Sequence, residues 1–154
     1  MKSAFRFMSY KVDSLELKIR NSLGMLQKVY FDEKWGIEFG LRIPQYWTNA
    51  KVYIAGLECK MTYPPLEGDP DGGNAVEISG GAMGMFEVEE GRFAPEVEKD
   101  IVTKHLPTLV MPYLRSTLTS VLANSGIGIH VFPLVNLHEV AAETLKNQDI
   151  IVHP

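Results

Sequence analysis

Few residues of this sequence have the types and the spacing that catalysis or metal binding requires. Its four histidines show neither an HExxH pattern nor another zinc-ligand spacing, and one cysteine is too few for a thiolate zinc site or an intramolecular disulfide. That cysteine, Cys59, alternates in phase with Leu57 and Met61, which indicates a buried core thiol rather than a nucleophile. We therefore expect no enzyme, with no catalytic residue, no metal and no cofactor.

Two other clusters with possible chemistry have simpler explanations. The glycine-rich run SGGAMGM lacks the Gly-Lys-Ser/Thr ending of a phosphate loop and is not followed by a helical pattern, so a bent strand explains it better. The carboxylates Glu87, Glu89 and Glu90 lie at the end of a strand pattern, where a solvated face and an acidic partner-binding patch both stay open. Neither cluster predicts a reaction.

The composition is that of a soluble protein with one domain, spanning residues 1–154. Of the 154 residues, 45% are hydrophobic and 22% are charged, which is enough apolar content for a core without disulfides. The net charge of −4 argues against nucleic-acid binding and gives no electrostatic reason for membrane attachment. No apolar run is long enough for a signal peptide or a membrane span, so we expect a cytoplasmic protein without membrane insertion.

The first two-thirds of the chain shows the period-two pattern of strands that bury one face. Apolar side chains alternate with others over residues 15–19, 35–43 and 53–63, and prolines end the last two runs. The turn-forming stretch at 64–74 predicts an exposed hairpin loop. The pattern resumes over 75–88 but changes phase around its glycines, which predicts a bulged or sharply bent strand there.

The last third shows helical spacing. Residues 95–105 predict one or two turns, and a broad apolar face from Pro107 to Gly126 predicts a long helix with Pro112 near its start. Asn136 and Glu139 resemble an N-terminal capping pair for a second helix. Strands followed by helices indicate an α+β fold, with an antiparallel sheet covered on one face.

The large apolar side chains of the predicted sheet are unusual for a sheet that so few helices cover. They are Trp35, Phe39, Met83, Met85 and Phe86. Periodicity alone favours ordinary core or dimer-interface residues. Flexible methionines also suit surfaces that accept many different sequences.

The segment LPTLVMPYLRSTLTSVLANSGIGIHVFPLVN, residues 106–136, resembles the helix-and-return segment of SecB export chaperones. The matching positions are Pro107, Pro112, Tyr113, Arg115, Val135 and Asn136. Upstream, VYIAGLECKMTY is similar to the central strand of that family and GMFEV to the strand after its hairpin. Trp35 lies where the family often has a tryptophan.

This resemblance implies a four-stranded antiparallel sheet with two helices on one face, assembled as a homotetramer, a dimer of dimers. It also implies an ATP-independent chaperone that holds unfolded preproteins in apolar grooves and passes them to the SecA ATPase. The candidate polypeptide-binding residues are Trp35, Met83, Met85 and Phe86. The long helix packs between dimers in the family, which makes Leu114, Leu118 and Val121 candidate interface residues.

One departure from the family concerns the SecA-docking face, where the family carries a Leu-x-Glu arrangement. The matching positions here are Glu77 and Ser79, which are the candidate docking residues of this chain. A chaperone dedicated to one client, such as an antitoxin, fits this departure. A non-enzymatic oligomeric interaction module and a small-molecule-binding protein with a pocket between sheet and helices also stay open.

Overall fold

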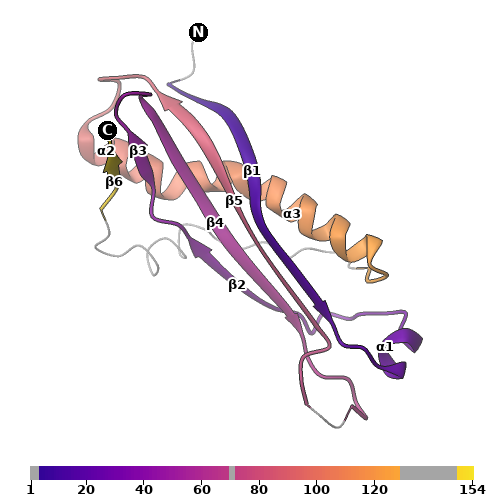
Figure 1. Ribbon diagram of the computed structural model, residues 1–154. Helices are drawn as coiled ribbons and strands as arrows, with labels where there is room; N and C mark the ends of the chain where they lie inside the picture. Colours follow the sequence, from indigo (N-terminus) through magenta and orange to yellow (C-terminus); the bar gives the residue numbers. More distant parts are fainter. Residues whose placement is uncertain (1–3, 70–71, 129–148) are drawn as a thin grey trace.

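The computed structural model describes residues 4–69, 72–128 and 149–154, which form a long twisted sheet with one long helix across one face (Figure 1). The strands are β1 (Phe5–Ile19), β2 (Gly36–Leu41), β3 (Gln45–Trp47), β4 (Val52–Tyr63), β5 (Val76–Val88) and β6 (Ile151–His153). The helices are α1 (Leu23–Gln27), α2 (Pro95–Asp100), the π-helical turn η1 (Ile101–His105) and α3 (Leu106–Asn124). The second predicted helix, from Asn136, lies outside the described residues.

The sheet is larger than the four antiparallel strands that we expected. Within the described residues six strands pair in the order β1-β5-β4-β3-β6, and β2 pairs with the far half of β4. β2 lies within the strand predicted over 35–43, and β3 is a short additional strand that begins just after Pro44, because proline cannot donate to a ladder. β6 then adds to β3 in parallel, so the fold is α+β with a mixed sheet.

The bulges lie on β1 and not on β5. β5 pairs with β4 in one unbroken antiparallel register from Val76 to Glu87, so the predicted phase change at its glycines does not occur. The register shifts instead between Phe7 and Ser9 and between Val12 and Ser14 of β1, each shift leaving one extra residue. Two of the three β5 glycines, Gly80 and Gly84, instead allow close approach of the helix.

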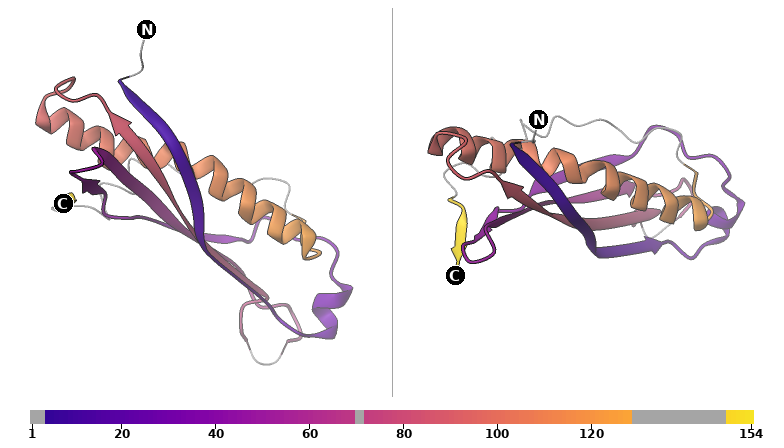
Figure 2. Two further views of the ribbon diagram at one scale, coloured as in Figure 1. Left: turned by 45° about the horizontal axis from the view of Figure 1, so that its top comes forward. Right: turned by 90° about the horizontal axis from the view of Figure 1, so that it is seen from above.

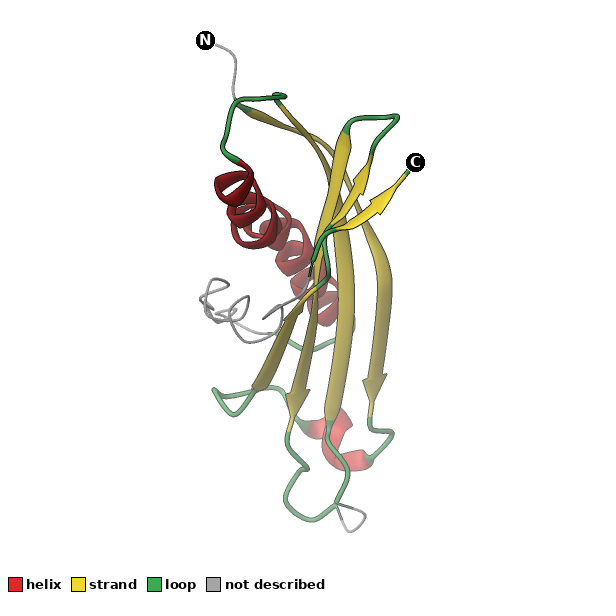
Figure 3. Cartoon of the chain, turned by 90° about the vertical axis from the view of Figure 1, so that its left-hand side faces the viewer, coloured by secondary structure: helices red, strands yellow, loops and turns green. Residues whose placement is uncertain are grey.

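Gly80 and Gly84 lie on the face of β5 that α3 covers. A Cβ atom at Gly80 would lie 3.0 Å from Leu118 and 3.2 Å from Leu114, and one at Gly84 would lie 2.8 Å from Val110. The absence of side chains here therefore lets the helix lie close to the middle of the sheet. Figures 2 and 3 show the helix on one side of the sheet only.

The core lies between this helix and the alternate residues of β4 and β5. Fully buried members from the two strands are Leu57, Met61, Val76, Ile78, Ala82 and Phe86. The alternation predicted for 53–63 is confirmed, since Tyr53, Ala55, Cys59 and Tyr63 are buried as well. The buried face predicted for residues 15–19 of the edge strand β1 is not confirmed, because Leu15 is 46% exposed in the protomer.

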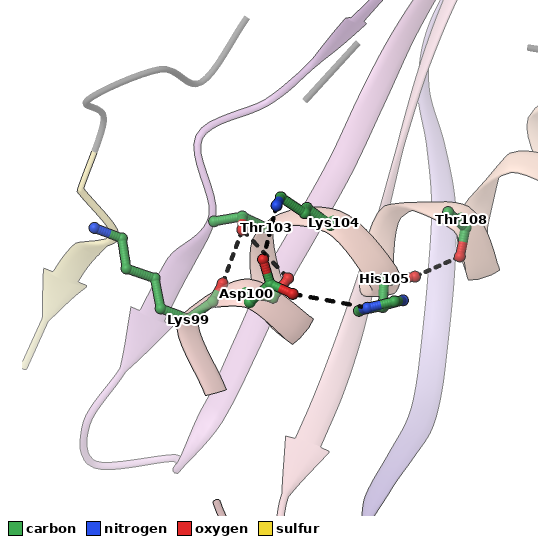
Figure 4. A network of polar contacts seen from close by, with 6 residues as sticks. All are labelled: Lys99, Asp100, Thr103, Lys104, His105 and Thr108. Carbon is green, nitrogen blue, oxygen red and sulfur yellow. Dashed lines mark hydrogen bonds and ion pairs between the residues drawn. The ribbon is translucent and has the colours of Figure 1, made fainter. Parts of the chain in front are cut away.

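The helical turns predicted over 95–105 and the long helix predicted from Pro107 form one continuous helical segment, which begins at Pro95 and continues through Pro107 and Pro112. Pro107 has no N–H to donate, and the wide π-helical turn just before it closes with Leu106 N–H on the Ile101 carbonyl. The hydroxyl of Thr103 donates to the Lys99 carbonyl (2.8 Å), and Lys104 pairs with Asp100 (2.9 Å), as Figure 4 shows. These local bonds support the turn where the backbone ladder is irregular.

An ion-pair network crosses the face of the sheet that α3 leaves uncovered. Arg42 makes two hydrogen bonds to the Asp13 carboxylate, at 2.6 and 2.8 Å, and its Nε lies 3.4 Å from Glu58. Asp13 is the extra residue of the second β1 bulge, which aims it at Arg42. Arg42 passes over Gly81, where any Cβ atom would overlap its guanidinium. The network therefore ties β1 to the β2–β3 edge.

This network predicts a dependence of stability on acid pH. The hydrogen bonds from Arg42 hold the pKa of Asp13 below its ordinary value in the folded chain, so protonation favours the unfolded chain. We expect wild type to be more stable than Asp13→Asn at pH 7, and this difference to shrink as the pH falls below about 4. Urea denaturation of both proteins at pH 7, 5 and 3 measures it. A difference that stays constant over this range would contradict the assignment.

Candidate functional site

Three aromatic rings form a cluster, defined here as Phe31, Trp35 and Tyr63, on the helix side of the sheet. Phe31 and Trp35 come from the segment between α1 and β2, and Tyr63 is the last residue of β4. Tyr63 meets Phe31 and Trp35 edge to face, with ring centroids 5.1 and 5.2 Å apart. These contacts place Trp35, the first of the predicted binding residues, against a rigid strand end.

Polar groups fix the orientation of this aromatic cluster. The Tyr63 hydroxyl donates to Asp32 over 2.7 Å, which lowers the pKa of the carboxyl, while burial and this bond raise the pKa of Tyr63. The ammonium of Lys28 lies 5.3 Å from the centroid of Phe31 and 5.5 Å from that of Tyr63. At neutral pH the acid is therefore ionised and the phenol neutral, as their hydrogen bond requires.

The indole nitrogen of Trp35 is buried and has no hydrogen-bond partner among the described residues, although the side chain as a whole is half-buried. An unpaired indole N–H is costly in an apolar setting, and tryptophan usually finds an acceptor when it is buried. The backbone carbonyl of an extended peptide is an acceptor of the required kind. The cluster is thus an apolar assembly that contains one buried donor without a partner among the described residues.

An exposed apolar patch, the α1 patch, adjoins this segment in the chain. Ser22 caps α1 by accepting from the Met25 N–H at 3.2 Å, and the side chain of Met25 is buried. Because Met25 is buried, the other apolar side chains of this segment point to solvent. The side chain of Leu26 is 84% exposed and that of Val29 is 89% exposed. The members of the α1 patch are Leu23, Leu26, Val29 and Tyr30. The sequence pattern did not predict this patch, although the run LGMLQKVYF, residues 23–31, is apolar without strand alternation.

The structure does not bring the four predicted polypeptide-binding residues together. Met83 and Met85 are half-buried on the uncovered face of the sheet, where they line a shallow depression of about 140 Å³ with Ile54. Phe86 lies on the opposite face, fully buried beneath the helix and 4.9 Å from the ring of Phe7. Alternation along one strand separates them.

The predicted docking residues Glu77 and Ser79 share the uncovered face with the methionines. Both are half-buried, and Glu77 accepts a hydrogen bond from Asn74 at 3.1 Å. Ser79 lines a broader depression of about 470 Å³, together with the charged side chains Glu38, Glu58 and Lys60. One end of this face is therefore polar and the other is apolar.

The predicted interface residues Leu114 and Leu118 are core residues of the protomer. Both are fully buried and face Gly80 of β5, so they have no surface to offer another subunit. Val121 is half-buried. The exposed apolar side chains of α3 are instead Leu109 and Tyr113, and Tyr113 stacks on Tyr10 of β1 with ring centroids 4.0 Å apart. The apolar face of α3 is broad enough to contact both the sheet and another subunit. Its central residues pack against Gly80 and Gly84 of β5, so they belong to the core of the protomer.

Groups with reactive chemistry are few in the described part of the chain. Cys59 is buried as predicted, and burial raises the pKa of its thiol to about 12, which leaves it protonated at neutral pH. No group of three or more His, Cys, Asp and Glu side chains there is arranged to hold a metal ion. None of the helices in the described segments is long and apolar enough to cross a membrane.

The fold is that of SecB-like chaperones. The SecB-like chaperone of Mycobacterium tuberculosis, solved with a peptide from the HigA1 antitoxin, superposes with a TM-score of 0.60 over 86% of this chain and 91% of the other, at 7% identity. A Streptococcus agalactiae protein of unknown function matches over 84% of this chain and 97% of its own at 17% identity, but its TM-score of 0.30 is too low to indicate a shared fold. No protein-family model and no curated protein matches the sequence.

Proposed function

We propose that this protein is a molecular chaperone that holds unfolded polypeptides without ATP and without enzymatic activity, in the cytoplasm. The observation that carries the proposal is the exposed α1 patch, which the partly buried Trp35 and the buried rings of Phe31 and Tyr63 adjoin in a SecB-like fold. A holder of many clients needs apolar area more than sequence-specific polar contacts. The Trp35 indole N–H is buried and unpaired in the protomer, so a client carbonyl would reach it only when binding opens the cluster.

The energetics suit such a site. Full burial of one large apolar side chain contributes about 1.5–3 kcal/mol, and the exposed side chains of the α1 patch offer several such contacts. Ordering a flexible client costs roughly 2–5 kcal/mol or more, so a few contacts suffice for net binding. Met83 and Met85 offer a second apolar surface on the other face. Buried Phe86 supports that strand from beneath.

The second candidate function is that of a chaperone dedicated to one client. It is favoured by the antitoxin peptide in the M. tuberculosis structure and by the departure at Glu77 and Ser79 from the family's docking pair. Hand-over to SecA would use the polar end of the uncovered face, where Glu77 and Ser79 lie. A variant with both residues changed to alanine would then hold clients normally and lose SecA binding.

We also propose that the chain assembles as a homotetramer, a dimer of dimers. β1 is 15 residues long, and its outer edge pairs with no other described residue. Apolar side chains of β1, such as Leu15 and Tyr10, and Tyr113 of α3 stacked on Tyr10 are exposed in the protomer. A second copy would cover both the edge and these side chains. Light scattering measures the assembly.

The test of holding is the refolding of a slow-folding, denatured secretory precursor without ATP, with the protein added in increasing amounts. We expect refolding to stop as the protein approaches stoichiometry with the precursor. A small-molecule-binding protein or a module for one folded partner would leave the refolding rate unchanged. Unchanged refolding of a general precursor, with binding of one unfolded partner, would favour the dedicated chaperone.

We expect Trp35→Ala to weaken the binding of a permanently unfolded chain, such as reduced and carboxymethylated α-lactalbumin, by roughly tenfold or more, because the variant loses one large apolar contact. Fluorescence anisotropy measures the affinity. Trp35→Phe is the matched control, since it keeps an aromatic ring and loses the N–H; an intermediate loss would assign part of the effect to that donor. Unchanged affinity in a folded Trp35→Ala protein would exclude the aromatic cluster from the site.

A further inference from the structure

The last residues of the sequence occupy a free edge of the sheet. β6 pairs in parallel with β3, so that Gln45, Tyr46 and Trp47 face Ile151, Val152 and His153. Ile151 N–H donates to the Pro44 carbonyl and Thr48 N–H to the His153 carbonyl, both over 3.0 Å. Figure 3 shows β6 at the rim of the sheet, beside β3. This chain thus completes its own edge by strand addition.

Side chains define what this edge accepts. The His153 imidazole stacks on the indole of Trp47, with centroids 4.1 Å apart and planes 17° from parallel, and its Nε2 lies 2.8 Å from Gln45 Oε1. Ile150, just before the strand, packs against the core. The edge therefore accepts an extended segment with one inward apolar residue and, three positions later, a flat ring.

Few contacts retain β6 on this edge. Only three residues pair, parallel pairs are the less stable kind, and the side chains of Ile151 and Val152 are 45% and 66% exposed. The ion pair between Lys99 and Asp149 spans 2.8 Å but lies at the surface, where such pairs contribute little. In Figure 4, Lys99 extends from the helix toward β6, the pale yellow strand. A competing strand therefore has to replace only a few contacts to displace β6.

We propose that the β3 edge is a strand-addition site for the client and that β6 is its built-in occupant, which the client displaces. This inference rests on the proposed chaperone function and adds a second subsite to it. An edge strand with unpaired N–H and C=O groups is a template for any extended backbone. β6 covers that template until a client arrives, which also protects the free protein from edge-to-edge association.

The first test is hydrogen exchange in the full-length, unmodified protein. Reduced and carboxymethylated α-lactalbumin is added at a saturating concentration. We expect the Ile151 amide to exchange faster, because it loses its hydrogen bond to the Pro44 carbonyl. The Thr48 amide stays protected, because a client carbonyl replaces that of His153. Continued protection of Ile151 at saturation would overturn the inference.

The second test weakens β6 by one hydrogen bond. Ile151→Pro removes the N–H that bonds Pro44, and Ile151→Ala is the control that keeps it. We expect Ile151→Pro to bind the unfolded chain about fivefold more tightly than Ile151→Ala, since a larger fraction of molecules has a free edge. A labelled peptide DIIVHP, residues 149–154, is expected to bind the proline variant in preference to wild type.

The outcomes separate this inference from the proposed function. Equal client affinity for the proline and alanine variants, with client binding intact, overturns strand displacement and leaves the chaperone function standing. An absence of client binding by wild type and by both variants overturns the two proposals together. Far-UV circular dichroism confirms that each variant is folded before its affinity is compared.

Discussion

Leu118→Ala is expected to lower the free energy of unfolding by about 2–5 kcal/mol, the range for deletion of a fully buried leucine side chain. Leu118 is fully buried and would lie 3.0 Å from any Cβ placed at Gly80, so its removal leaves a cavity between helix and sheet. The neighbouring elements are a long helix and a central strand, which limits their collapse into that space. Urea denaturation measures the loss.

The matched control is Leu109→Ala on the same helix, where the side chain is 39% exposed. We expect it to cost much less in an isolated protomer, because little buried volume is lost. Protein concentration distinguishes core from interface: the effect of Leu118→Ala stays the same on dilution if Leu118 belongs to the core. A destabilisation by Leu118→Ala that changes with protein concentration would show that Leu118 belongs to an interface between subunits.

Gly56→Ala is expected to destabilise the protein by about 1–3 kcal/mol, the usual cost of overpacking. Gly56 pairs with Met83 in the centre of the sheet, and an added Cβ would overlap the backbone carbonyl of Ala82. A side chain can rotate away from such a contact, but a strand backbone cannot move without disturbing the ladder between β4 and β5. Thermal denaturation by circular dichroism reports the change.

Gly40→Ala provides the control for this change. Gly40 also lies in a strand, β2, but an added Cβ would have no atom within 4 Å. We expect its stability to be unchanged or slightly raised, because alanine loses less conformational freedom on folding than glycine. Equal losses at both positions would show that the cost is a general property of strand glycines and not a result of the Ala82 contact.

Part of the candidate site could be predicted from the sequence. Trp35 was identified from its size, its position at the start of a strand pattern and the family resemblance, and the structure places it in an aromatic cluster with its indole N–H buried. The α1 patch was missed, because its exposure depends on Met25 and Phe31, which turn inward and leave their apolar neighbours outside. Which of several adjacent apolar residues is buried is decided by the partner surface, and local sequence carries no signal for that.

The sequence by itself determined the elements whose signal is periodic. Apolar alternation over 53–63 predicted β4, and helical spacing after Pro107 predicted α3, because period and burial are local properties of each segment. The α+β order of elements followed from them. A proline at position 44 likewise marked the end of one strand pattern.

Only the tertiary structure decided how these elements use their faces and edges. It assigned Gly80 and Gly84 to close helix contact instead of a bulge, turned Leu114 and Leu118 into the core, and added β6 in parallel to β3. Each of these outcomes depends on residues far apart in the chain, such as Trp47 and His153, that meet only after folding. Register, edge pairing and the choice of partner for an apolar face are long-range properties, and for that reason local periodicity does not specify them.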